Sequence, residues 1–170
     1  WGGGLLFLDI DGVLHPLRVR HMSGGAVDTS HCFAPECMQQ LLRIVQATGA
    51  ELVLSSSWRA FDHSRAVALG ALAESGMACR DWTTTAGGES NEARVDQILA
   101  FAQATPNVSA WVAVDDEDLA PKQCEGAESM LRAAFRQRFV RASAATGLDA
   151  AAADELIRLL EDDDEDEDDD

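Results

Sequence analysis

The chain alternates between short apolar runs and segments with a helical pattern. Continuous apolar runs bounded by turn residues are typical of strands buried on both faces. Segments with apolar residues three and four positions apart are typical of amphipathic helices. We predict five strands, at 5–8, 51–54, 77–79, 110–114 and 138–142. We predict four helices, over 35–48, 64–74, 91–104 and 149–160.

Strands that alternate with helices favour right-handed crossovers and a parallel sheet covered on both faces. The predicted fold class is therefore α/β, a three-layer α/β/α doubly wound parallel sheet of Rossmann-like type. We expect a loop from His15 to Phe33 and an irregular region between Asp118 and Arg138. In such sheets ligands bind beyond the carboxyl ends of the strands, where the strand order changes direction.

Polar residues follow three of the predicted strands at the point where each strand ends. They are Asp9 and Asp11 after the first strand, Ser55 to Ser57 after the second, and Asp115 and Asp116 after the fourth. Carboxylates about 4 Å apart repel by roughly 4 kcal/mol per pair at an effective dielectric of about 20. Oxygen ligands of this kind suit Mg²⁺. A carboxylate can also attack phosphorus, and a second can act as general acid and base.

Charge divides the chain into a folded part and a tail. The 170 residues carry a formal net charge of −17. The last ten residues, 161–170, are all acidic, so −17 + 10 = −7 remains for the rest. Blocks of like charge repel and stay solvated, so we predict one domain over 5–160 and a disordered acidic tail over 161–170. An acidic body argues against broad binding to nucleic acid but not against a nucleic-acid end as substrate.

Four cysteines are present without a C-x-x-C pair, which predicts free thiols and a reducing, cytoplasmic location. No apolar run is long enough to span a membrane, so we expect no membrane partner. The segment Trp1 to Gly4 leads directly into the first strand, and no signal peptide is visible. The sequence leaves the oligomeric state open.

The polar strand ends carry a resemblance to the haloacid-dehalogenase-like (HAD) hydrolase superfamily. Residues 8–14, LDIDGVL, resemble its first motif, in which an apolar strand is followed by D-x-D-G. Residues 52–58, LVLSSSW, resemble the second motif, an apolar strand ending in Ser or Thr. Residues 111–116, WVAVDD, resemble the fourth motif, an apolar strand ending in two Asp.

The resemblance implies a role for each matching aspartate. Asp9 would be the nucleophile that forms an aspartyl phosphate, and Asp11 would be the general acid and base. Mg²⁺ would be held by Asp9, by the backbone carbonyl of Asp11, and by Asp115 or Asp116.

The resemblance also implies a phosphate-binding hydroxyl and a phosphate-binding basic residue, and each role has two candidates. The Ser-x-Trp spelling selects Ser56 as the phosphate-binding hydroxyl, with Ser55 as the competing choice. Arg94 matches the basic third motif by position, although most members have Lys there. Lys122 is the rival, but it lies after the acidic fourth motif.

The chain is most similar to the compact, capless HAD domain of RNA-repair ("Swiss Army Knife") proteins, through DGVLHP at 11–16, SSWR at 56–59 and TGL at 146–148. This implies a Mg²⁺-dependent phosphomonoesterase with an open site. The expected partner is a phosphorylated substrate, a nucleic-acid end or a phosphoprotein. The alternatives are a small-molecule phosphatase and a catalytically silent magnesium-binding or protein-interaction module. Asp11 favours catalysis, because a silent or receiver-like protein needs no general acid there.

Overall fold

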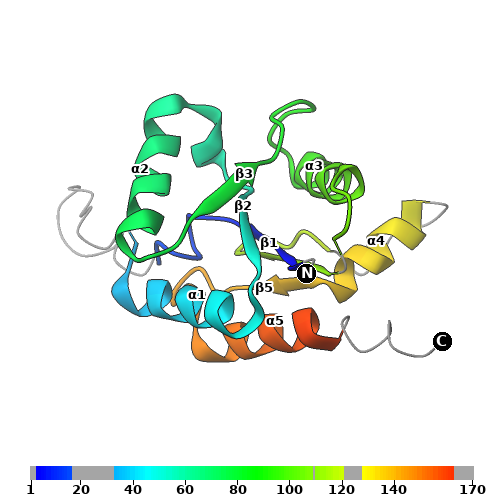
Figure 1. Cartoon of the computed structure of the whole chain (residues 1–170). Helices are drawn as coiled ribbons and strands as arrows, with labels where there is room; N and C mark the ends of the chain where they lie inside the picture. Colours follow the sequence, from blue (N-terminus) through cyan, green and yellow to red (C-terminus); the bar gives the residue numbers. More distant parts are fainter. Residues whose placement is uncertain (1–2, 17–32, 109, 121–127, 163–170) are drawn as a thin grey trace.

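The computed structural model describes residues 3–16, 33–108, 110–120 and 128–162. Within these residues a five-stranded, fully parallel sheet has the strand order β3-β2-β1-β4-β5 (Figure 1). In chain order the elements are β1 (Leu5–Leu8), α1 (Pro35–Thr48), β2 (Glu51–Leu54), the 3₁₀ helix η3 (Ser57–Ala60), α2 (Asp62–Glu74), β3 (Cys79–Trp82), α3 (Asn91–Ala104), β4 (Trp111–Asp115), α4 (Glu128–Gln137), β5 (Phe139–Arg141) and α5 (Ala150–Asp162).

Helices cover both faces of the sheet (Figure 1). On one face α1, α2 and α5 pack against Leu6, Leu8 and neighbouring strand residues. On the other face α3 and α4 pack against Leu5 and Phe7. The side chains of β1 therefore alternate between two separate cores, as expected for a central strand buried on both sides.

The strand order changes direction between β1 and β4. From β1 the chain proceeds through α1 and α2 toward β3 at one edge, and it then returns through α3 to β4 on the opposite side of β1. The register pairs Leu8 with both Leu54 and Val114, so the residues that follow these three strands lie at the same edge. That edge is the expected ligand position of a doubly wound sheet.

The structure confirms the predicted fold class and most of the elements. Helices α1 and α3 have the predicted bounds, and Gly49 closes α1 in the left-handed conformation. The third strand is Cys79–Trp82, later than the predicted 77–79, because its Arg80 and Asp81 are edge-strand residues without an apolar pattern. The segment 17–32 of the predicted loop lies outside the described residues.

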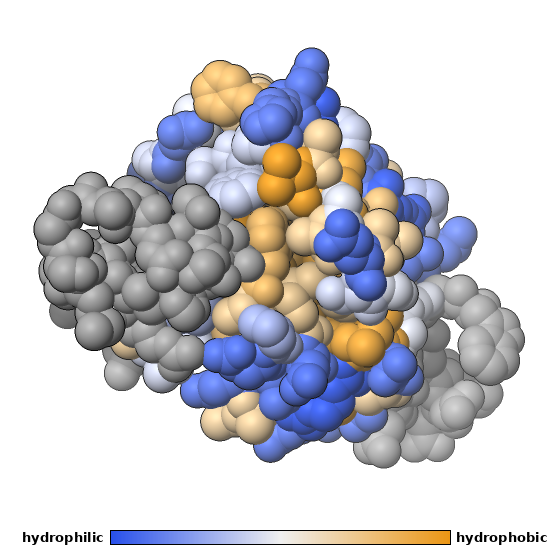
Figure 2. Space-filling view, turned by 90° about the vertical axis from the view of Figure 1, so that its left-hand side faces the viewer, coloured by the Kyte–Doolittle hydropathy of each residue, from blue (hydrophilic) through white to orange (hydrophobic). Residues whose placement is uncertain are grey.

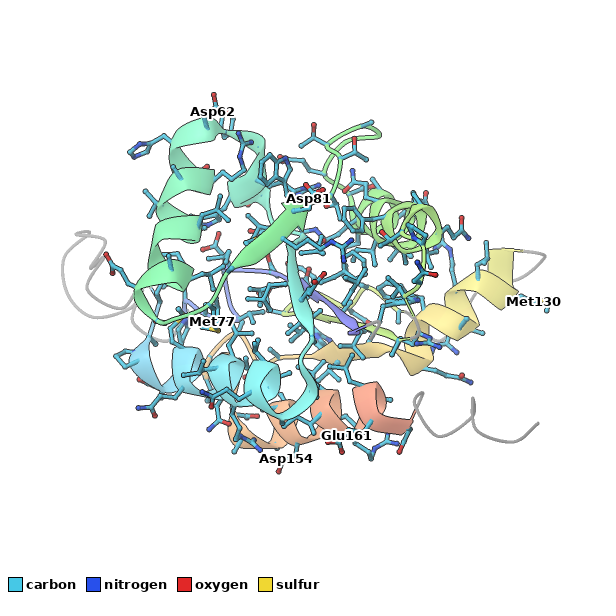
Figure 3. The ribbon with its side chains drawn as sticks, in the orientation of Figure 1. Asp62, Met77, Asp81, Met130, Asp154 and Glu161 are labelled. Carbon is cyan, nitrogen blue, oxygen red and sulfur yellow. The ribbon has the colours of Figure 1, made fainter. Side chains whose placement is uncertain are left out.

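Helix α4 occupies a region that we predicted to be irregular. Its apolar residues are divided between two environments: Phe135 is fully buried, whereas Met130 is 79 % exposed and projects away from the rest of the molecule (Figure 3). At the carboxyl end, α5 continues through Asp162, two residues into the predicted tail, where Arg158 pairs with Asp162. Residues 163–170 lie outside the described part, so the predicted disorder of the tail stays a prediction.

The view from the α2 side shows a band of apolar residues bordered by hydrophilic ones (Figure 2). Phe61, immediately before α2, and Val67 within it are among the exposed large apolar side chains, at 71 % and 43 %. In the described part of the chain, no helix has both the length and the apolar character needed to cross a membrane.

A turn after β5 holds the loop that follows β1. The backbone N–H of Leu148 donates to the carbonyl of Val13 at 2.7 Å, and the Cys37 thiol donates to the carbonyl of Thr146 at 3.6 Å. Gly147 lies between them with a φ of +70°, and a Cβ there would fall 2.6 Å from the Val13 carbonyl oxygen. The turn therefore requires glycine both for its backbone angle and for its close approach to the first motif.

We expect Gly147→Ala to lower the free energy of unfolding by roughly 1–3 kcal/mol, because it adds both backbone strain and a clash with backbone. Urea unfolding followed by circular dichroism measures the change. Gly70→Ala is the matched control, since a Cβ at this α2 position meets no atom within 4 Å and alanine favours a helix. Equal stabilities of the two variants would contradict the assigned role of the Gly147 turn.

Candidate functional site

Three aspartates gather at the switch point of the sheet. Asp9 follows β1, Asp115 ends β4, and Asp116 comes next. Asp9 is 4 % exposed and Asp115 is 2 % exposed, while Asp116 is half-buried. One carboxylate oxygen from each lies within 4.8 Å of the others. The structure therefore brings Asp9 of the first motif together with both aspartates of the fourth motif.

Gly12 leaves the space that Asp116 occupies. Gly12 has a φ of +77°, and a Cβ built on it would lie 2.4 Å from the Asp116 Oδ2 atom. The turn that follows β1 is compact: the N–H of Gly12 donates to the carbonyl of His15 at 2.9 Å. The glycine of the D-x-D-G motif is thus required because the second carboxylate of the fourth motif packs directly against its backbone.

Arg94 supplies positive charge to the cluster from the first turns of α3. Its Nη1 donates to Asp115 Oδ2 at 2.8 Å and lies 3.7 Å from Asp9 Oδ1. The Ser90 hydroxyl caps the helix by accepting the N–H of Ala93 at 3.1 Å, which fixes the position of this turn. The rival residue, Lys122, lies outside the described residues.

The carboxylates are strongly perturbed by their surroundings. Burial and the neighbouring charge of Asp115 raise the pKa of Asp9 to about 9, although Arg94 acts in the opposite direction. Burial also raises the pKa of Asp116, which shares a side-chain hydrogen bond with Asp9. Burial lowers the pKa of Arg94, but the charges of Asp115 and Asp9 outweigh it and the pKa rises, so Arg94 stays charged. One guanidinium does not neutralise three carboxyl groups.

The donor set of this cluster fits a hard divalent cation. All of the contributed atoms are carboxylate oxygens, which suits Mg²⁺ with part of its water shell retained. Both oxygens of Asp115 already accept a hydrogen bond, one from Arg94 and one from the N–H of Glu117 at 2.9 Å. Each oxygen keeps a second lone pair, so Asp115 and Asp116 both stay candidate ligands.

The carboxylate of Asp11 lies outside this cluster. The indole N–H of Trp58 donates to Asp11 Oδ2 at 3.1 Å, and His15 Nδ1 lies 3.4 Å from Asp11 Oδ1. The side chain is 42 % exposed. This orientation keeps the carboxylate of Asp11 out of the cluster, and the role of its backbone carbonyl as a cation ligand stays a prediction. The same orientation leaves the carboxylate available for proton transfer.

The two candidate serines have different environments. The Ser56 hydroxyl accepts the N–H of Trp58 at 3.3 Å and caps η3. The Ser55 hydroxyl is buried and has no hydrogen-bond partner among the described residues. By strand alternation Ser55 falls on the same face as Val53, which packs in the core beside α3, the helix that carries Arg94. A hydroxyl that accepts one hydrogen bond can still donate its own proton, so the role of Ser56 as the phosphate-binding hydroxyl stays a prediction, with Ser55 as its alternative.

Arg59 anchors the loop after β3. It is 3 % exposed and donates to the carbonyls of Ser56 (2.5 Å), Thr83 (3.2 Å) and Thr84 (3.2 Å) and to Gln97 Oε1 (2.7 Å). Gln97 in turn donates to the carbonyls of Ala86 and Gly88 at 2.9 and 3.0 Å. Sequence reasoning missed Gln97, although a polar residue on the buried stripe of α3 was an available signal.

The sheet order, the switch point and the clustered aspartates together define a HAD-like domain. A family model described as "HAD domain in Swiss Army Knife RNA repair proteins" matches residues 5–153. The chain therefore belongs to this family of HAD domains. Neither the curated proteins nor the solved structures contain a match to the chain. HAD domains are generally hydrolases that use Mg²⁺.

We expect the buried Asp9 carboxyl to make the metal-free protein sensitive to pH. Its folded pKa of about 9 lies above the ordinary value of 3.8, so the folded state binds more protons between those limits. The contribution of Asp9 to stability is therefore lost as the pH rises from about 4 to about 9. Melting temperatures in the presence of a chelator should fall with pH more steeply for the wild type than for Asp9→Asn, which stays neutral.

Added Mg²⁺ should raise the melting temperature of the wild type, and more so at alkaline pH, because the ligands bind as carboxylates. Asp9→Asn should lose most of this stabilisation. Asp154→Asn is the control, since Asp154 is an exposed α5 residue far from the cluster (Figure 3). Equal stabilisation of Asp9→Asn and the wild type by Mg²⁺ would contradict the aspartate cluster as the metal site.

Proposed function

We propose that the domain is a Mg²⁺-dependent phosphomonoesterase that works through an aspartyl phosphate on Asp9. The observation that carries this proposal is that the two carboxylates of the first motif lie in different environments. Asp9 is buried against Arg94 and the other aspartates, whereas Asp11 is turned away from them toward Trp58 and solvent. This difference supports a role for Asp9 in attack and a role for Asp11 in proton exchange.

In the first step an ionised Asp9 oxygen attacks phosphorus, and the bond from phosphorus to the leaving oxygen breaks. Protonated Asp11 gives its proton to the leaving oxygen. In the second step water attacks the aspartyl phosphate, Asp11 accepts the proton, and Asp9 and inorganic phosphate are released. A bound Mg²⁺, held by Asp9, Asp115, Asp116 and the Asp11 carbonyl, would supply the positive charge that keeps Asp9 ionised and offsets the charge of the phosphate.

Two further residues support binding of a phosphate dianion at this position. Arg94 lies 3.7 Å from Asp9, and a guanidinium can bind phosphate oxygens as a planar fork. Ser55 offers a buried hydroxyl that has no partner among the described residues, at the end of the strand next to Asp9. A hydroxyl that donates to a phosphate oxygen satisfies both groups.

For the substrate we propose the terminal phosphate of a nucleic acid. The family takes its description from RNA repair proteins. The described segments leave little room for a cap: η3 alone joins β2 to α2, and residues 83–90 join β3 to α3. An open site suits a large substrate. A phosphoprotein and a small phosphate ester are the competing substrates. The reducing, cytoplasmic location stays a prediction.

Activity measurements test the proposal directly. We expect Mg²⁺-dependent release of phosphate from p-nitrophenyl phosphate and from 3′- or 5′-phosphorylated oligonucleotides. Asp11→Asn should lower kcat by about 10²–10⁴-fold through loss of acid–base catalysis, and Asp9→Asn should abolish turnover. Asp154→Asn serves as the control. A wild type that binds Mg²⁺ but is as inactive as Asp9→Asn on every substrate would favour the silent metal-binding module.

Trp58→Phe tests whether the indole N–H positions Asp11. The phenyl ring can keep the edge-on contact with Phe33, whose ring centroid lies 5.4 Å away, but it cannot donate to Asp11. Loss of one hydrogen bond, about 1 kcal/mol, should lower kcat about fivefold with little change in KM or melting temperature. A parallel loss of stability and of kcat would indicate that Trp58 acts only through packing.

A further inference from the structure

A polar cavity of about 410 Å³ lies between η3, α2 and the segment that follows β3. Its walls include two arginines, one tryptophan and three consecutive threonines: Arg59, Arg65, Trp82 and Thr83 to Thr85. None of the residues that line it is acidic. The cavity is therefore lined by positive charge, whereas the aspartate cluster carries negative charge. The mechanism proposed above does not use the cavity.

The cavity lies on the same edge of the sheet as Asp9. Thr83 follows β3, and its N–H donates to the carbonyl of Leu54 at 3.0 Å. The backbone N–H of Ser55, the residue after Leu54, donates to the carbonyl of Leu8, the residue before Asp9. Neighbouring strands are about 4.8 Å apart, so Thr83 and Asp9 are separated by two strand spacings, about 10 Å. A group one nucleotide away from a phosphate at Asp9 can span this separation.

Three residues in its walls indicate that the cavity suits an anion, and the first is Arg59. The buried guanidinium of Arg59 donates to three carbonyls and one amide, and no described carboxylate lies within ion-pair distance of it. Glu89 and Asp9 act on it only through longer-range electrostatics. A buried guanidinium without an anionic partner is costly, and an anion in the cavity would remove that cost.

Arg65 contributes a second guanidinium, held 4.2 Å over the ring of Trp82. Its acidic partner, Asp62, is 97 % exposed and points outward at the start of α2 (Figure 3). Because solvent screens that pair, the charge of Arg65 stays available to a ligand.

Thr83 provides an unsatisfied donor in the cavity wall. Its side chain is fully buried, and its hydroxyl has no hydrogen-bond partner among the described residues. A buried hydroxyl without a partner is unfavourable, and an acceptor oxygen in the cavity would satisfy it. Phosphate oxygens are acceptors only, so they match both the hydroxyl and the guanidinium groups.

We propose that this cavity binds the phosphodiester next to the terminal phosphate of a nucleic-acid strand. The inference rests on the phosphatase function proposed above and names the part of the substrate that would distinguish a strand end from a small phosphate ester. In this arrangement Arg94 and Ser55 hold the terminal phosphate next to Asp9. Arg65 and Thr83 hold the adjacent phosphodiester.

The test compares a dinucleotide that carries a terminal phosphate with the corresponding nucleoside monophosphate, each as the 3′ and the 5′ isomer. Wild type should have a higher kcat/KM for one dinucleotide. Arg65→Gln should lower that value about tenfold and Thr83→Val severalfold, without changing the value for the monophosphate. Arg80→Gln is the matched control, because it removes an exposed arginine of β3 that pairs with Glu51 outside the cavity.

Equal effects of the variants on dinucleotide and monophosphate, or no effect on either, would overturn the assignment of the cavity. Binding of a labelled dinucleotide to Asp9→Asn protein, followed by fluorescence anisotropy, tests the cavity without turnover. Weaker binding after Arg65→Gln or Thr83→Val supports the proposal, and unchanged binding overturns it. Loss of turnover on all substrates with normal binding would contradict the phosphatase function alone.

Discussion

Repulsion between buried carboxylates at one edge of the sheet is the constraint on which the site depends. Asp9 and Asp115 end two adjacent central strands, and both are almost fully buried. Their charges raise the free energy of the folded chain unless a proton, a cation or a guanidinium compensates. Arg94 compensates in part, through its hydrogen bond to Asp115 and its proximity to Asp9. The remaining imbalance is the physical reason that the site suits a divalent cation.

The surrounding structure holds these charges in place from several directions. Gly12 admits Asp116 against the turn after β1, and Ser90 fixes the helical turn that carries Arg94. The turn at Gly147 closes over the same loop from the end of β5. Segments that are distant in the chain thus pack around the first motif.

The fold and the aspartate cluster could be predicted because both depend on short, local patterns. An apolar run that ends in carboxylates determines a strand and its carboxyl end, and parallel strands bring such ends together. Helix α4 was missed because its apolar residues are divided between the core, at Phe135, and solvent, at Met130. The different environments of Ser55, whose hydroxyl is buried without a partner among the described residues, and of Ser56, which caps η3, depend on local contacts that the spacing of residues does not show. The orientation of Asp11 likewise depends on Trp58, 47 positions along the chain.

The loop between β3 and α3 is tied down over only part of its length. Arg59 holds the carbonyls of Thr83 and Thr84, and Gln97 holds those of Ala86 and Gly88. No hydrogen bond of this network reaches beyond Gly88, and the helix cap begins anew at Ser90. Residues inserted between Gly88 and Ser90 would lengthen the loop and leave these four anchoring hydrogen bonds intact. The fold therefore has a position at which this loop can be extended, in evolution or by engineering, without disturbing the hydrogen bonds that anchor it.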